Sequence, residues 1–246
     1  MPTPRTEVAA AALGTEIFVI GGFEAGGSPS DKVEIYDTQT DSWSEAAPLP
    51  EARHHSAATA YNNEIWVIGG FAGADFNRPL DFVWAIRSSG FGSPKQPLNE
   101  ARGALAAVAP GQPIVFGGAA VGPEGDSLSL ATVESFDPGL GAWDLWTRAL
   151  NSPRDHLAAA AAAVCGGGDD CGIYLYTIGG RVDLDFAQNL DVTELSSFGT
   201  WTEAAPMPTA RSGIAAVSYP APQGYGGRIY VFGGEAPEGT FDENEA

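Results

Sequence analysis

Five glycine pairs, each closing a short apolar run, divide this chain of 246 residues into units of similar length. The pairs begin at Gly21, Gly69, Gly117, Gly179 and Gly233. Arginines precede them at Arg5, Arg53, Arg102, Arg154 and Arg211. Both markers recur at intervals of roughly 50 residues, and a shared period of that length is typical of repeat architectures. The chain is therefore interpreted as one array of repeats.

The segments between these markers predict four strands in each complete unit. The first strand is rich in small residues, and we expect it at residues 8–13, 56–60, 104–109, 157–164 and 214–217. Residues 157–164 alone would favour a helix, because alanine is the best helix former. They occupy the place of a strand in the other units, which favours a strand here as well. After a second apolar strand and a third strand such as residues 33–37, an aromatic residue follows at Trp43, Phe91, Trp143 and Trp201.

The order arginine, small-residue strand, apolar strand, Gly-Gly, aromatic-acid strand and tryptophan resembles the kelch repeat across the whole chain. The resemblance implies an all-β fold, a kelch-type β-propeller of four-stranded antiparallel blades, four complete and one partial. We expect a single domain over residues 1–246. Its blades are expected near residues 1–50, 51–100, 101–152, 153–208 and 209–246.

Both ends of the sequence match interior positions of a repeat. Residues 1–5 align with residues 207–211, and residues 241–246 enter the third strand of the fifth unit and stop there. We therefore expect an open arc of about 18 strands, or a fragment of a larger propeller, since closed rings have whole blades.

The chain is strongly acidic, with a formal net charge of -19. Such a charge repels phosphate backbones and anionic membrane surfaces, so nucleic acid is not an expected partner. No apolar run reaches the roughly 18 residues that a membrane span requires, so membrane insertion is not expected either. The first residues also lack the basic and apolar segments of a signal peptide.

The repeated arginines are expected at the heads of the inner strands, where they would ring one end of the channel. Acids gather in the loops after the glycine pairs: Glu24, Asp31, Asp75, Asp81, Glu124, Asp126, Asp183, Asp185, Asp191, Glu235, Glu238 and Asp242. In one interpretation arginines and carboxylates pair and brace the blades. In the other, unpaired members bind a partner on a recognition face. The candidate binding residues are Arg5, Arg53, His55, Arg102, Arg154, His156, Arg211, Asp183, Asp185 and Glu235.

The histidines could carry chemistry. His55 and His156 each lie two residues after the arginine of their unit, and His54 is adjacent to the first. A metal site or an acid/base pair is one interpretation. Equivalent positions in different blades need not be close, so solvated or hydrogen-bonded histidines are the favoured one. We expect no metal, no cofactor and no catalytic residue.

Two cysteines flank a glycine-rich loop. Cys165 and Cys171 lie between the first and second strands of the fourth unit, at the base of a hairpin, where paired strands can supply disulfide geometry. A bridge is favoured over free thiols or a metal site, and it would indicate export. Calcium at Asp169 and Asp170, or at Asp183 and Asp185, lacks the full ligand series of a known calcium loop.

Fold alone does not fix function, and propellers include binders and enzymes. The favoured function is a binding or scaffolding module that uses one loop face to recognise a protein or carbohydrate. The alternative is a carbohydrate-active enzyme, similar to galactose oxidase or to sialic-acid epimerase-like kelch propellers. The copper site of galactose oxidase includes a Tyr-His neighbour pair, which is not found here. We expect an extracellular or periplasmic protein, with the cytoplasm as the alternative.

Overall fold

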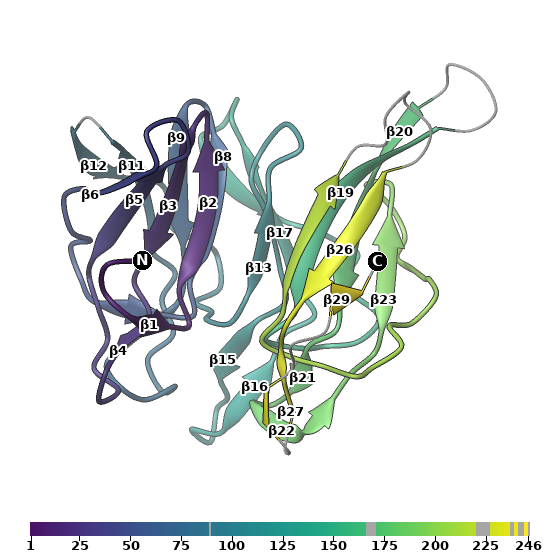
Figure 1. Cartoon of the computed structure of the whole chain (residues 1–246). Helices are drawn as coiled ribbons and strands as arrows, with labels where there is room; N and C mark the ends of the chain where they lie inside the picture. The colour runs from purple at the N-terminus through teal and green to yellow at the C-terminus, as the bar shows by residue number, and fades with distance from the viewer. Residues whose placement is uncertain (89, 166–170, 220–226, 237–238, 241–243, 246) are drawn as a thin grey trace.

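The computed structural model describes residues 1–88, 90–165, 171–219, 227–236, 239–240 and 244–245. Within these ranges the regular structure consists of strands, arranged as antiparallel sheets around a common axis (Figure 1). No helix in the described part of the chain is long and apolar enough to cross a membrane.

Four sheets have four strands each, and every pairing in them is antiparallel. Blade 1 contains β2 (Ala9–Leu13), β3 (Glu16–Ile20), β5 (Val33–Asp37) and β6 (Ser42–Glu45). Blade 2 contains β8 (Ala57–Tyr61), β9 (Glu64–Ile68), β11 (Val83–Arg87) and β12 (Gly90–Pro94). Blade 3 contains β13 (Ala106–Val108), β14 (Ile114–Phe116), β17 (Val133–Asp137) and β18 (Ala142–Leu145). Blade 4 contains β19 (Ala158–Cys165), β20 (Cys171–Ile178), β23 (Thr193–Ser196) and β24 (Thr202–Glu203).

Blade 5 has three strands among the described residues. They are β25 (Ala215–Tyr219), β26 (Arg228–Phe232) and β29 (Asn244–Glu245), with β26 in the centre. The prediction that the chain enters a third strand in this unit is met by β29, which pairs with Val231 and Phe232. The structure is thus an all-β propeller with four four-stranded blades and a partial fifth.

The inner strands β2, β8, β13, β19 and β25 lie side by side in this order around the axis. Alanine dominates them because the space narrows toward the axis and admits only small side chains. The alanine run at residues 157–164 follows the same logic. It forms β19, paired with β20 along its full length, so the helix propensity of alanine is overridden by the blade.

The apolar cores lie between neighbouring blades. Trp143 packs with Trp66 and Leu98 in the cluster that joins blades 2 and 3. Trp201 takes the same place between blades 3 and 4, against Phe116. Large aromatic side chains fill the wedge that opens between two sheets away from the axis. Trp43, on the first blade, remains 37% exposed.

Each interface between blades is also joined by the same pair of backbone hydrogen bonds. The second glycine of one unit donates its N–H to the carbonyl of the next unit's arginine, as from Gly118 to Arg154 at 3.0 Å. In the opposite direction, the residue two places after that arginine donates to the preceding unit, as from His156 to Ala104 at 2.8 Å. Gly118 has a φ of 100°, and a Cβ on this residue would lie 2.7 Å from the Gly103 carbonyl oxygen. Glycine is therefore required for this close approach.

In the described part of the chain, five short two-stranded sheets lie at one end of the blades, and they were not predicted. They form from the segments after each arginine or glycine pair, at the lower end in Figure 1. We call this end the hairpin face. Its strands are β1 (Arg5–Thr6) with β4 (Phe23–Glu24), β7 (Arg53–His54) with β10 (Phe71–Ala72), β15 (Ala119–Val121) with β16 (Ser127–Ser129), β21 (Arg181–Val182) with β22 (Asp185–Asn189), and β27 (Glu235–Ala236) with β28 (Gly239–Thr240).

Candidate axial site

The repeated arginines are buried inside the blades. In blades 1, 3 and 4 the side chain reaches the third strand of its own blade, where a glutamate accepts its hydrogen bonds. Arg102 Nη2 lies 2.8 Å from Glu134 Oε1, and the side chains of both residues are fully buried. The bonds from Arg5 to Glu34 and from Arg154 to Glu194 are equivalent, at 2.9 and 2.5 Å. The arginines also donate to backbone carbonyls, as from Arg102 to Gly117 at 3.0 Å.

These contacts brace the blades, as one interpretation of the sequence proposed, although the carboxylates lie on third strands and not in the loops. Burial also removes the arginines from the exposed surface of the hairpin face. The predicted binding residues Arg5, Arg53, Arg102, Arg154 and Arg211 are each at most 7% exposed.

Blade 2 departs from this pattern. Trp84 occupies the register position that Glu34 holds in blade 1, since each lies opposite the valine two residues before the first glycine. Arg53 consequently makes no ion pair among the described residues, and its guanidinium lies 4.7 Å from the Phe82 ring centroid. Burial lowers the pKa of Arg53 to about 10. In blade 5, Glu245 holds the position of Glu34 in the strand register.

A second repeated position lies two residues after each arginine, and it faces the axis. All five residues there have a left-handed backbone, with φ between 52° and 61°. Backbone hydrogen bonds link each to the one before, so they form an arc around the axis, which we call the axial ring. Its members are Glu7, His55, Ala104, His156 and Gly213.

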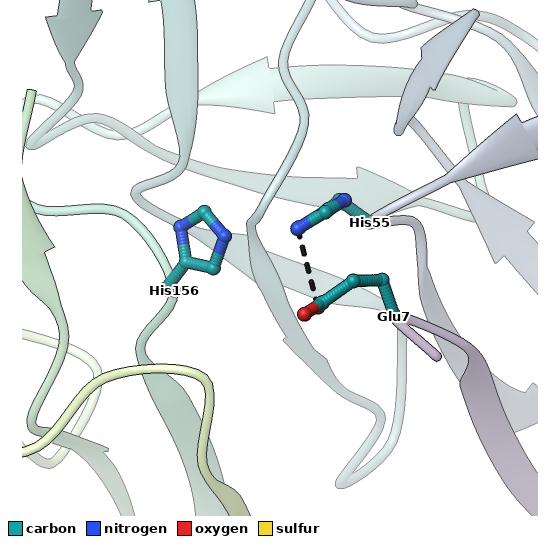
Figure 2. Close-up of side chains that lie close together, drawn as sticks. All are labelled: Glu7, His55 and His156. Carbon is teal, nitrogen blue, oxygen red and sulfur yellow. Dashed lines mark ion pairs between the residues drawn. The ribbon is translucent and has the colours of Figure 1, made fainter. Parts of the chain in front are cut away.

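The ring brings the two predicted histidines together, which the sequence analysis did not expect. The ring centroids of His55 and His156 are 4.7 Å apart. His55 Nε2 lies 3.1 Å from Glu7 Oε2, and one ligand atom of each of the three residues lies within 4.8 Å of the others. Figure 2 shows the three side chains pointing toward one another from separate segments. The two histidines are buried and Glu7 is partly exposed.

A second layer of charged groups holds His156. Its Nδ1 lies 2.6 Å from Asp155 Oδ1, and its Nε2 lies 2.9 Å from Arg181 Nη2. Because a guanidinium only donates, Nε2 accepts and Nδ1 carries the proton. Arg181 also bonds to Glu235 Oε1 at 2.6 Å. Burial would raise the pKa of Asp155, but the hydrogen bond from His156 leads the contacts that bring it below its usual value.

His54 supports the other histidine. Its Nδ1 lies 2.5 Å from His55 Nδ1, and its ring stacks on Phe23 with centroids 4.0 Å apart. His54 Nε2 has no hydrogen-bond partner among the described residues. Burial lowers the pKa of His54 to about 4 and that of His55 well below its usual range, so both imidazoles are neutral at pH 7.

The axial ring lines a pocket of about 340 Å³. Glu7, His55 and His156 contribute its polar wall, while Leu105 and Ile214 contribute apolar surface. A volume of this size lies at the lower end of the range for small-molecule sites, and a few convergent polar groups are typical of them. The pocket is therefore the candidate functional site.

Comparison with known proteins agrees with this architecture. A model of the Kelch motif matches residues 4–50 and 52–87. Kelch-like protein terF from Aspergillus terreus is 28% identical over 99% of this chain and 53% of its own length. Human Kelch-like protein 34 is 30% identical over 62% of this chain and 23% of its own. Human Kelch-like protein 25 is 42% identical over 22% of this chain and 9% of its own.

The chain is a kelch-repeat protein. Three observations support this assignment: the Kelch motif in the first two units, the kelch-like relative that covers 99% of the chain, and the repeated blades. The kelch chain spans about half the length of terF and smaller fractions of the other two relatives.

Other predicted site residues of the kelch chain lie on the hairpin face. Asp183 Oδ1 accepts a hydrogen bond from the Ser129 N–H at 2.8 Å, which ties the hairpins of units 3 and 4. Asp185 is exposed and accepts from the Ala187 N–H at 2.9 Å. Glu235 binds Arg181 and so belongs to the axial site.

Cys165 and Cys171 are direct partners in the register of β19 and β20. Opposite residues in an antiparallel pair have Cα atoms about 4.5–5.5 Å apart, which a disulfide can span. The bridge itself stays a prediction. Asp169 and Asp170, considered as a calcium site, lie outside the described residues.

Sequence reasoning missed Glu7, Asp155 and Arg181 as members of the kelch chain's axial site. One signal could have found Glu7: it lies two residues after Arg5, as His55 and His156 do after their arginines. Residues at one repeat position near the axis must converge, since the inner strands meet there. Arg181 follows a glycine pair and carries no comparable signal.

Proposed function

We propose that this kelch-repeat chain is a binding module and that its partner docks on the hairpin face, with one side chain or sugar entering the axial pocket. The observation that carries the proposal is the pocket itself, where polar groups from units 1, 2 and 4 converge at the centre of that face. A rigid scaffold with variable loops around one concavity is a common arrangement for recognition.

Charge indicates the chemistry of the partner. Glu7, Glu235 and Asp155 contribute three carboxylates against the single guanidinium of Arg181, so hydrogen-bond acceptors are in excess at the site. The whole chain carries -19. A basic or hydroxyl-bearing group is therefore the best fit, and a protein that presents one is the proposed partner. Carbohydrate hydroxyl groups are the second possibility that this chemistry supports.

Exposed apolar side chains on the hairpin face add contact area. Phe186 on β22 is 45% exposed and lies over the Arg181 guanidinium at 4.0 Å, and Leu128 on β16 is 43% exposed. Aromatic residues such as phenylalanine are enriched at protein–protein interfaces.

The proposal is tested with a peptide-display library and a glycan array, each probed with wild type, Phe186→Ser and Phe198→Ser. Phe198 is 51% exposed and lies in the turn that follows β23, at the end away from the hairpins. We expect peptides with basic residues to be enriched, and Phe186→Ser to weaken them about 10-fold, which corresponds to roughly 1.4 kcal/mol. Equal losses of binding in both variants, or no enrichment in either the peptide library or the glycan array, would refute the proposal.

We also propose that the chain acts without catalysis. His156 has both ring nitrogens engaged, by Asp155 and Arg181, and His55 has both engaged, by His54 and Glu7. A general base needs a free site within reach of a substrate proton. Turnover of sugars in an oxidation or epimerisation screen, lost in Glu7→Gln, would contradict this.

Export is proposed on the basis of the two cysteines. A strand pair that places Cys165 opposite Cys171 favours a bridge in an oxidising compartment. Mass spectrometry without reductant should show the mass of the reduced chain less two hydrogen atoms. Two alkylatable thiols in protein isolated from an oxidising compartment would exclude the bridge.

A further inference from the structure

The cluster of Glu7, His55 and His156 has features that a binding face does not require. The three side chains come from three different units, and their ligand atoms lie within 4.8 Å of one another. They meet at the wall of a pocket, so a fourth position next to them opens on solvent.

The orientation of the imidazoles is the second feature. Asp155 accepts the Nδ1 proton of His156, so Nε2 faces the cluster. Metal-binding histidines almost always donate their other ring N–H to such a carboxylate, which fixes the tautomer. His55 also directs Nε2 inward, because its Nδ1 contacts His54. When His55 binds through Nε2, its proton moves to Nδ1 and is donated to His54 Nδ1, whose own proton moves to the Nε2 of His54.

The spacing fits a tetrahedral ion after a small movement. Bonds of about 2.0–2.1 Å place two ligands about 3.4 Å apart in tetrahedral geometry. His55 Nε2 and Glu7 Oε2, at 3.1 Å, are already near that separation. No pair of the three ligand atoms exceeds 4.8 Å, so closing the site requires an approach of about 1.4 Å at most.

Arg181 opposes the ion. Its Nη2 donates a hydrogen bond to His156 Nε2 at 2.9 Å, and this bond must break before His156 can coordinate a metal ion through Nε2. The guanidinium keeps two carboxylates when it withdraws, Glu235 at 2.6 Å and Asp155 at 3.5 Å. Arg181 is therefore a built-in competitor of the metal, and this gives a test that a purely structural cluster would fail.

We propose that Glu7, His55 and His156 bind one divalent transition-metal ion, with Zn²⁺ as the best match. Two imidazoles and one carboxylate are a known zinc donor set, and the ligand count leaves one open position. Asp155 and Glu235 supply the negative charge that offsets the ion. The open position faces the axial pocket, where water or a donor group of a ligand would complete the shell.

The experiment uses untagged protein stripped with a chelator and titrated with zinc chloride alone in a calorimeter. We expect one ion per chain in wild type. Glu7→Gln should weaken binding at least about 10-fold, since loss of even outer partners costs 10- to 100-fold. Glu45→Gln, an exposed glutamate on β6, is the matched control and should bind as wild type does.

Arg181→Gln should bind zinc more tightly than wild type, because it removes the group that competes for His156. Circular dichroism of the metal-free variants shows whether each is folded. Should Glu7→Gln fail to fold, Co²⁺ titration of wild type replaces it, with intense visible bands expected from a tetrahedral site. Wild type without one-to-one binding, equal affinity in folded Glu7→Gln, weaker binding in Arg181→Gln, or Co²⁺ spectra of hydrated ion alone would each overturn the proposal.

Discussion

Two positions in the repeat, only two residues apart, behave in opposite ways. The first is arginine in every unit, and it is buried in every blade. The second differs from unit to unit and faces the axial pocket: Glu7, His55, Ala104, His156 and Gly213. Wherever it occurs, the arginine is buried and donates to a backbone carbonyl of its own blade. The variable position shares only a backbone conformation, so its side chains are available to give the pocket its chemistry.

The largest effect is expected from breaking a braced arginine. Glu134 accepts hydrogen bonds from Arg102 at 2.8 Å and from the Asn99 side chain at 2.8 Å. Glu134→Ala removes the buried partner of Arg102 and leaves only the partly exposed Glu100, at 2.8 Å. Breaking the buried pair should lower the free energy of unfolding by about 3–5 kcal/mol. Urea unfolding measures it, and Glu45→Ala should stay within about 0.5 kcal/mol of wild type. A loss below 1 kcal/mol would mean that the pair does not brace the blade.

Blade 2 sharpens the comparison, because its arginine has no glutamate. Arg53→Met leaves no carboxylate behind and gives up only long hydrogen bonds, to Glu51 O at 3.3 Å and Gly69 O at 3.4 Å. We expect Arg53→Met to lower the free energy of unfolding by about 1–2 kcal/mol. Arg102→Met should lower the free energy of unfolding by about 3–5 kcal/mol, because it leaves the buried Glu134 carboxylate without its ion partner. Equal losses in the two variants would show that the glutamate is irrelevant.

Acid should remove the brace in blade 1. Burial would raise the pKa of Glu34, but hydrogen bonds from Thr3 and Arg5 bring it below its ordinary value of 4.5. The folded state therefore holds the proton less tightly than the unfolded state does. The resulting stability is complete above pH 4.5 and is lost as the pH falls through the lowered pKa.

Urea midpoints of wild type and Glu34→Gln, compared from pH 7 to pH 3, measure this loss. The advantage of wild type should shrink below pH 4.5. A difference that stays constant over the whole range would contradict the assignment of the lowered pKa to Glu34.

The smallest effect is expected on the axial ring. Ala104 has a φ of 52°, which glycine adopts without strain, and its buried methyl group packs with Phe71 and Ala119. Ala104→Gly should therefore change the free energy of unfolding by no more than about 1 kcal/mol, the cost of one lost methyl group. Gly118→Ala is the contrasting variant and should cost more, because its Cβ would lie 2.7 Å from the Gly103 carbonyl oxygen. A severe loss in Ala104→Gly would show that the ring position is structural too.

Much of the fold could be predicted, because each unit reports on the others. The alanine run of β19 is ambiguous by itself, and only its place in the repeat makes it a strand. The hairpins had no such support, since segments such as 181–189 differ from unit to unit in length and composition. The carboxylates that receive the arginines were placed in the loops, because sequence spacing does not reveal which face of a third strand lies against the arginine.

The site was harder to predict than the fold. His55 and His156 lie in units that are not adjacent along the chain, and their contact depends on how tightly the inner strands close around the axis. A period gives the length of a unit and not the radius of the ring. Once the ring position is known, Glu7 can be predicted as a member of the site, because it lies two residues after Arg5 in the sequence. Arg181 can be assigned to the site only from the structure.

The two backbone hydrogen bonds at each interface have an implication for descent. They join Gly22 to Arg53 and His55 to Glu7 in one interface, and Gly180 to Arg211 and Gly213 to His156 in another. No side chain takes part in them, so a duplicated unit would find partners on both sides without any further substitution. Gene duplication can thus lengthen such an array before selection acts on the new copy. The residue that the copy brings to the axis is then free to diverge.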